Sequence, residues 1–480
     1  MTPAWRERVP AGSWDAVVVG SGPNGLAAAI TLAREGRRVL VVEAADEAGG
    51  GLRSAELTEP GFVHDLCATI FAIGAVSPFF RSLPPEAREF VVPPLALAHP
   101  FDDGRAAVLD RGVAATASGL GADGPAWSRT FAPLVDRWDD VAHDALGPPH
   151  LPRHPFRLAR FGLDAVRSAA SLARARFAGA AARALFAGLA AHGNVPLEGA
   201  ASAAIGLVLG ATAHAGGWPV ARGGSGRIAA GLVAHLAALG GTLVTGARVV
   251  SLDELPPSRC ALLDVTPRQL LAMAGGRLPL RYRRALARFR PGAGVFKVDY
   301  ALEAATPWRA AECARAATVH LGGSFEETAA SEAAVARGEA PERPFVILVQ
   351  PTLVDPSRAP AGRHVAWAYG HVPNGWTGDL LPRIEAQIER FAPGFRDVVR
   401  ARSVWTPARL EVSNPNHAGG DIGGGAADLR QLLARPVLSL DPYATPLEGV
   451  FLCSSSTPPG AGAHGLCGVH AARSALRRGF

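Results

Sequence analysis

The 480-residue sequence is poor in lysine and cysteine. Lys297 is the only lysine, so arginine supplies nearly all the positive charge and a lysine Schiff base would have a single candidate. The five cysteines are far apart and form no CxxC pair, which indicates neither a disulfide framework nor a zinc site. We therefore expect no metal, and a reducing cytoplasm as the location.

A long uninterrupted apolar run is also missing. Residues 199–221 carry no Asp, Glu, Lys or Arg, but glycines, His214 and Pro219 interrupt them, and only 203–213 is convincingly apolar. This length predicts a buried helix and not a membrane span. The first residues lack the apolar segment of a secretory signal, and we expect 1–13 to be a flexible tail.

The net charge of +6 is spread thinly, and no basic run is interleaved with aromatic residues. We therefore expect no nucleic-acid partner and a small-molecule substrate instead. A chain of this length, 48% hydrophobic, predicts a globular enzyme of two interleaved domains.

The chain opens with a strand, a glycine turn, a helix and a second strand. The strands are expected at 15–19 and 38–42, and the helix at 25–35. In the turn, the first glycine permits a sharp bend, the second lets the backbone approach a pyrophosphate, and the third lets helix and strand pack closely. The predicted dinucleotide contacts in this turn are Gly20, Ser21, Gly22, Pro23, Asn24 and Gly25.

An acidic residue follows at the end of the second strand. Glu43, with Ala44 beside it, is placed to accept hydrogen bonds from both ribose hydroxyls and would repel a 2′-phosphate. A second glycine segment comes shortly after. Its predicted cofactor contacts are Gly50, Gly51, Arg53 and Ser54, with the arginine expected beside the pyrophosphate. The two segments together favour FAD over NAD.

A second G-x-G-x-x-G occurs at 460–465, where too few residues follow to build another strand and its acid. We interpret it as a helix N-terminus that faces the flavin ring and stabilises negative charge there. The predicted contacts are Gly462, His464, Gly465 and Leu466.

These patterns predict an α/β protein with a discontinuous Rossmann-type FAD-binding domain and an inserted α+β substrate domain. Strand-prone runs at 294–302, 345–349 and 364–369 suggest that the substrate domain has its own sheet. The FAD domain is expected from 14–100, 220–290 and 440–480, and the substrate domain from 101–219 and 291–439.

Several motifs resemble those of the phytoene-dehydrogenase-like flavoproteins, the family of carotenoid desaturases and isomerases. They lie at 17–26, 49–57, 77–80, 223–226, 263–268, 414–421 and 458–468. The Pro23-Asn24-Gly25 form is closer to the branch of pyridine nucleotide-disulfide oxidoreductase domain-containing protein 2. The resemblance implies hydride transfer from a C–H bond to flavin N5, and an adenine near Val249. Two residues depart from the family pattern, Phe71 in place of a histidine and His417 in place of an aromatic residue.

His464 and His417 are the candidate catalytic groups, because both lie in glycine-rich loops assigned to the flavin end and histidine exchanges protons near neutrality. The leading hypothesis is an FAD-dependent dehydrogenase or desaturase of a lipophilic small molecule. A flavoprotein amine oxidase is an alternative, for which Lys297 would be the lysine near N5. A non-redox isomerase or a flavin-stabilised interaction protein is another.

Three arginines recur every seven residues, at Arg160, Arg167 and Arg174, opposite Phe156, Leu163 and Ala170. On one helix they would form a basic stripe. Such a stripe predicts either a solvated helix face or a peripheral membrane contact through which lipophilic substrates enter.

Overall fold

The computed structural model describes residues 3–480, and its first sheet is built from short apolar segments that lie far apart in the sequence. All neighbours in this sheet are parallel, in the order β16-β10-β1-β2-β9. The strands are buried on both faces, which is why they are continuous runs of Val, Leu and Ala. Their bounds are β1 Trp14–Val19, β2 Val39–Val42, β9 Thr242–Val244, β10 Ser258–Leu263 and β16 Val450–Leu452.

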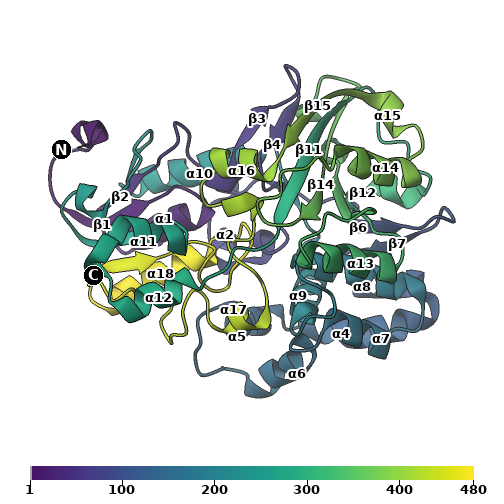
Figure 1. Ribbon diagram of the computed structural model, residues 1–480, viewed down its shortest axis with the longest axis horizontal. Helices are drawn as coiled ribbons and strands as arrows, with labels where there is room; N and C mark the ends of the chain where they lie inside the picture. The colour runs from purple at the N-terminus through teal and green to yellow at the C-terminus, as the bar shows by residue number, and fades with distance from the viewer. Residues whose placement is uncertain (1–2) are drawn as a thin grey trace.

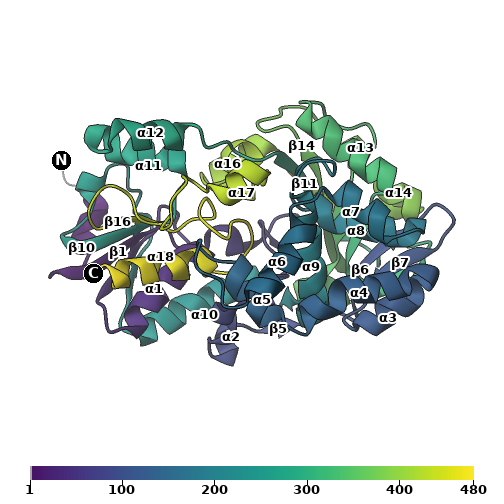
Figure 2. The same cartoon turned by 90° about the horizontal axis from the view of Figure 1, so that it is seen from below.

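Helices cover both faces of this sheet (Figures 1 and 2). One face carries α1 (Pro23–Arg34), α10 (Ser225–Ala238) and α18 (Leu466–Arg477), and the other carries α11 (Pro267–Ala274) and α12 (Leu280–Ala287). Helices α1 and α18 cross closely, because a Cβ on Gly468 would stand only 1.8 Å from the carbonyl oxygen of Asn24. Helices α18 and α1 therefore pack with their backbones in direct contact.

The second sheet has seven strands in the order β15-β11-β14-β13-β12-β6-β7, and it is antiparallel except for the pair β12 and β6. Strand β6 lies within 14–100, the range expected for the first domain, yet it pairs in this sheet. The bounds are β6 Leu95–Pro100, β7 Ala106–Leu109, β11 Gly294–Leu302, β12 Ala316–Leu321, β13 Val346–Val349, β14 His364–Val372 and β15 Val399–Trp405.

A helical layer packs on one face of the second sheet, and α14 (Leu381–Phe391) with α15 (Phe395–Val398) packs on the other. The layer contains α3 Val113–Gly119, α4 Gly124–Val135, α5 Trp138–Ala145, α6 Pro155–Ala165, α7 Ala169–Arg176, α8 Ala180–Ala191, α9 Ser202–Gly216 and α13 Phe325–Ala336. Helix α9 is the expected charge-free helix, and its Gly210 leaves room for the ring of Phe131. No helix within 3–480 is long and apolar enough to cross a membrane.

Short elements connect the two units. They are α2 Pro78–Arg81, α16 Pro407–Ser413, α17 Leu429–Leu433, β3 Ser54–Glu56, β4 Val63–Asp65, β5 Phe90–Val91 and β8 Val220–Ala221.

Two expectations are corrected. The described part of the expected flexible tail, 3–13, contains a helical turn at Ala4–Arg8 whose Trp5 is buried against the first sheet; residues 1–2 lie outside the described chain. The single basic stripe is also wrong, since α6 ends at Ala165 and α7 starts after Ser168, whose side chain accepts a hydrogen bond from the Ser171 amide and caps the new helix.

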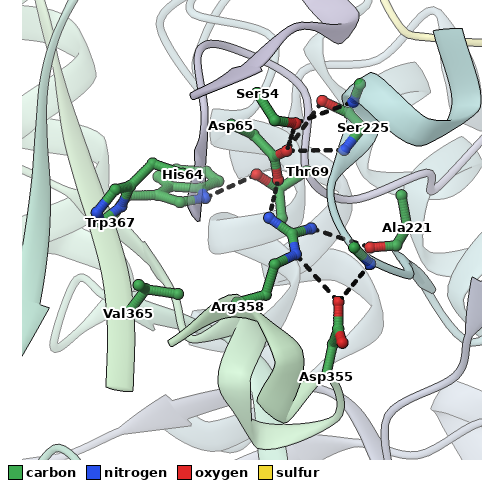
Figure 3. A network of polar contacts seen from close by, with 12 residues as sticks. Ser54, His64, Asp65, Thr69, Ala221, Ser225, Asp355, Arg358, Val365 and Trp367 are labelled. Carbon is green, nitrogen blue, oxygen red and sulfur yellow. Dashed lines mark hydrogen bonds and ion pairs between the residues drawn. The ribbon is translucent and has the colours of Figure 1, made fainter. Parts of the chain in front are cut away.

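A buried ion-pair network joins the two units (Figure 3). Arg358 is fully buried and donates to Asp65 at 3.0 Å, to Asp355 at 3.1 Å and to the carbonyl oxygen of Ala221 at 2.9 Å. The other oxygen of Asp65 accepts from the amide of Ser225 at 2.7 Å. Burial raises the pKa of Asp65, but Arg358 and these hydrogen bonds outweigh it and hold the pKa below its ordinary value. One guanidinium thus ties β4, the β8–α10 turn and the loop before β14.

Replacing Arg358 with Met should lower the free energy of unfolding by about 3–5 kcal/mol, because the Asp65 carboxylate stays buried without its cation. Urea denaturation measures the loss. The matched control is Arg337→Met, which removes an exposed pair with Glu339 and should cost under about 1 kcal/mol. Equal losses in the two variants would contradict the assigned role.

Candidate functional site

A cavity of about 1040 Å³ runs between the two units. The turn after β1, the end of β2, the loop after α16 and the loop before α18 line one part, and α6, the turn after α8, α9, β13 and β14 line another. The cavity thus brings together most of the residues that the sequence assigned to a cofactor. The assigned residues that line it are Gly20, Gly22, Pro23, Asn24, Glu43, Ala44, Gly50, Gly51, Val249, His417, Gly462 and His464.

The first glycine turn is shaped for a close backbone approach. Gly20 takes φ 97°, which permits the bend, and a Cβ on Gly25 would lie 2.0 Å from the carbonyl oxygen of Gly20. A Cβ on Gly50 would lie 2.9 Å from the Cα of Gly22. Helix α1 begins at Pro23, which has no N–H. The amide of Gly25 donates to Asp264, whereas the amides of Gly22 and Asn24 have no hydrogen-bond partner among the described residues. The cradle has the shape and the donors that a phosphate requires.

Glu43 is oriented by the same turn. One carboxylate oxygen accepts from the amide and the hydroxyl of Ser21, at 2.7 and 2.6 Å, and the other accepts from the amide of Ala45 at 2.9 Å. The oxygen that accepts from Ala45 keeps a further lone pair, and Glu43 lines the cavity. Ser21 itself is buried behind Glu43, so it positions the acid.

Arg53 and Ser54 do not line the cavity, unlike Gly50 and Gly51. Arg53 donates to the carbonyl oxygens of Gly50 and Ser413, at 3.0 and 2.7 Å. Ser54 donates to Asp65 at 2.6 Å. Arg53, which was expected beside the pyrophosphate, therefore stabilises the glycine loop from outside the cavity.

The late glycine loop contributes its first half to the cavity. Gly462 and His464 line it, whereas Gly465 and Leu466 lie at the buried start of α18. The His464 ring accepts from the amide of Leu466 at 3.0 Å through Nδ1 and contacts the carbonyl oxygen of Ala461 at 3.2 Å through Nε2. Burial lowers its pKa to about 4. The ring is neutral and fixed by its own loop, which suits a positioning role better than proton exchange.

His417 faces the cavity from the loop after α16. Its Nε2 lies 3.4 Å from Asn414 Nδ2, which can only donate, so this nitrogen accepts and Nδ1 carries the proton. Burial, with a smaller effect of Arg53, lowers the pKa of His417 to about 4. A neutral imidazole at this place can donate a hydrogen bond without bringing charge.

The remaining wall is apolar and aromatic. Trp367 and Tyr369 stack with ring centroids 5.6 Å apart, and Trp367 donates to Thr69 at 2.8 Å. Lys297 is not in the wall, because its ammonium is buried between both oxygens of Asp299 and the carbonyl oxygen of Asp65. The only lysine is thus committed to a structural ion pair. Other residues of this wall are Ile70, Ile73, Val208, Leu209, Trp218, Ile347 and Val349.

Sequence reasoning did not assign several charged residues that line the cavity, among them Asp264 and Arg435. Asp264, directly after β10, accepts from the amide of Gly25 at 3.0 Å. Arg435 is buried and donates to the carbonyl oxygens of Gly424 and Ser455, at 2.8 and 3.0 Å. The end of β10 was a detectable signal for Asp264, since ligands bind at the carboxyl ends of parallel strands. Arg435 has no comparable local pattern.

Comparisons with known proteins agree with this geometry. Residues 18–83 match the family described as NAD(P)-binding Rossmann-like domain. The chain has a Rossmann-type nucleotide-binding domain. Pyridine nucleotide-disulfide oxidoreductase domain-containing protein 2 of Mus musculus is 27% identical over 302 residues, which cover 55% of this chain and 52% of that protein. The chain thus matches only about half the length of this relative.

Two further comparisons place the fold. One of the subunits of limonene dehydrogenase from Castellaniella defragrans is 39% identical over 97 residues, 20% of this chain and 17% of that protein. A redesigned putrescine oxidase superposes with a TM-score of 0.62 at 18% identity, over 97% of this chain and 98% of that one. The whole chain therefore has the fold of the amine-oxidase-like oxidoreductases, and the relation to carotenoid desaturases stays a prediction.

Asp264 should make stability depend on pH. Burial, countered by the amide of Gly25 and reinforced by Glu43, raises its pKa from 3.8 to about 7. The folded state therefore keeps a proton that the unfolded chain has lost, and stability falls as pH rises from about 4 to about 7. Asp264→Asn should remove this loss. The free energy of unfolding of the variant, relative to that of the parent protein, should therefore rise by up to about 4 kcal/mol between pH 4 and pH 8.

Urea denaturation at both pH values, without added nucleotide, measures this gain. A stability difference between variant and parent that does not change with pH would contradict the assignment. Asp253→Asn, at an exposed aspartate of the same unit, is the control and should show no such gain.

Proposed function

We propose that the chain is an FAD-dependent oxidoreductase that dehydrogenates a lipophilic small molecule. The observation that carries the proposal is one continuous cavity that joins the glycine cradle, Glu43 and the late glycine loop to an apolar wall. These features would bind a dinucleotide, and the remainder of the cavity would admit a substrate. The fold shared with putrescine oxidase supports the same class of reaction.

Each part of the cavity has a role in this proposal. The amides of Gly22 and Asn24 would bind the pyrophosphate, and Glu43 would bind the ribose. His464 and Gly462 shape the loop at the isoalloxazine. When bound, FAD supplies a hydride acceptor at N5. The raised pKa of Asp264, about 7, lessens the negative charge beside the phosphates near neutral pH.

The wall around the substrate favours a neutral, lipophilic molecule over an amine. Among residues 3–480, the carboxylates that line the cavity are Glu43, Asp144 and Asp264. Glu43 and Asp264 lie on the nucleotide side, and Asp144, in α5, is already bound by two histidines and two backbone amides. A buried ammonium group would therefore lack a counter-ion. Lys297 is occupied by Asp299, which leaves the amine-oxidase alternative without its lysine. The similarity to the limonene dehydrogenase chain, named for a terpene hydrocarbon, points the same way.

Purified protein should be yellow, and Glu43→Gln should weaken FAD binding roughly 10- to 100-fold, because a charged hydrogen-bond acceptor at the ribose is lost. Titration of flavin fluorescence measures both affinities. Glu35→Gln, at the exposed end of α1, is the control and should leave the affinity unchanged. A protein that takes up no FAD would refute the proposal.

Substrate class is tested by anaerobic bleaching of the flavin with monoterpenes and other neutral lipids, with product masses recorded. A product two hydrogens lighter supports dehydrogenation. Bleaching by an amine panel, with hydrogen peroxide formed in air, would favour the amine oxidase instead. A product of unchanged mass would favour the isomerase.

We also propose that the protein draws its substrate from an anionic lipid surface through the outer face of α6. Phe156 is 90% exposed and Leu163 is 74% exposed, while Leu158 and Phe161 of the same helix line the cavity. Exposed Leu438 and Leu440 follow α17, another helix of the cavity wall. Exposed arginines near these apolar residues match anionic headgroups: Arg153 precedes α6, while Arg160 and Arg157, which also pairs with Asp140, lie in it.

The protein should float with phosphatidylglycerol vesicles at low salt. Phe156→Asp combined with Leu163→Asp should lower vesicle binding on the order of tenfold or more, since two apolar anchors are lost. Val412→Asp changes an equally exposed apolar residue on α16 and should have no effect. Recovery of the parent protein in the unbound fraction would refute the lipid contact.

A further inference from the structure

The apolar wall contains two polar side chains for which the proposed reaction provides no use. His192 and Asn194 follow the C-terminal end of α8, and both line the cavity beside the ring of Trp218. The centroids of His192 and Trp218 are 5.6 Å apart. Polar groups in such surroundings cost free energy unless they have a partner. Their chemistry therefore bears on what the cavity binds.

The protonation of His192 follows from its neighbour. His192 Nε2 and His320 Nε2 are 2.9 Å apart, so one donates and the other accepts. Burial lowers the pKa of His192 to about 3 and lowers that of His320 well below its ordinary value, which makes both rings neutral. His320 Nδ1 is buried without a partner and packs against Gly188 of α8, where a Cβ would be 2.4 Å away.

A buried N–H without an acceptor is more costly than a bare ring nitrogen, so His320 carries its proton on Nε2 and donates to His192. His192 must then carry its proton on Nδ1. That nitrogen has no hydrogen-bond partner within residues 3–480 and keeps accessible surface on a residue of the cavity wall. The cavity therefore meets a fixed N–H donor at this point.

Asn194 adds a second donor. Its Oδ1 is buried without a partner, while its Nδ2 makes no hydrogen bond to the described residues and is accessible. The backbone of Asn194 is left-handed, with φ 53°, a conformation that asparagine tolerates better than most residues. The side chains of this turn thus present two donors to the cavity.

We infer that His192 and Asn194 form a subsite for an uncharged oxygen acceptor, such as a carbonyl oxygen, on an otherwise lipophilic substrate. The inference rests on the proposed function in that the cavity admits the substrate. A carboxylate is excluded as the bound group, because it would be buried without a cation. Among the described residues, the arginines that line the cavity are Arg248 and Arg435, and both belong to the nucleotide-side loops. The substrate is thereby oriented with its oxygen at α8.

Methyl nonyl ketone and its alkene isostere, in which =CH₂ replaces the carbonyl oxygen, test the subsite. Titrations follow tryptophan fluorescence, to which Trp218 and Trp367 in the wall contribute, with FAD-loaded protein and with protein as purified. The preference for the ketone should fall roughly tenfold in His192→Phe, which keeps a ring and removes the donor. Asn194→Gly keeps the left-handed backbone and should show a comparable loss. His235→Phe, outside the cavity, should show none.

A second measurement uses the parent protein, so it does not depend on whether a variant folds. Nitrogen-15 NMR of the histidine rings in the parent protein should show His192 protonated at Nδ1; protonation at Nε2 would overturn the inference. An unchanged preference in both variants, or no binding of either probe, would also overturn it. Ketone selection by a protein that takes up no FAD would support the subsite and refute the flavoenzyme proposal, so the two failures are distinguishable.

Discussion

The contact between Arg358 and Asp65 is the interaction on which the geometry of the cavity depends. Neither group could be buried alone, since an unpaired charge in the interior costs several kcal/mol. Together they fix the end of β4 against the loop before β14 and the turn before α10. Thr69 follows β4 by only a few residues and holds the indole of Trp367. The ion pair therefore sets the distance between the glycine cradle and the aromatic wall.

Local sequence patterns predicted the first unit well. The glycine turn, the acid at the end of β2 and the late glycine loop all meet in one cavity, and the strand-prone run 294–302 is β11 residue for residue. These features depend on side chains within a few positions of each other. Periodicity and turn chemistry are local, so a single sequence is enough to find them.

The errors have a different origin. Arg53 was expected at the cofactor, but its partner Ser413 is 360 positions away in the sequence. Asp264 and Arg435 reach the cavity only through long-range packing. The break between α6 and α7 was within reach, because Ser168 is a favourable capping residue. The seven-residue spacing of the arginines obscured that signal, because it suggested one continuous helix. Regular spacing alone does not require one.

The crossing of α1 and α18 has a consequence for biosynthesis. Helix α1 is synthesised long before its partner α18, and β10 is synthesised well before the strand β16 that pairs with it. The nascent chain therefore carries an incomplete parallel sheet, with an exposed edge at β10, until β16 has emerged. Native contacts that join distant segments form slowly and leave such edges open to aggregation. Chaperone occupancy on the ribosome, more than the stability of the finished protein, would then limit the yield of folded chains.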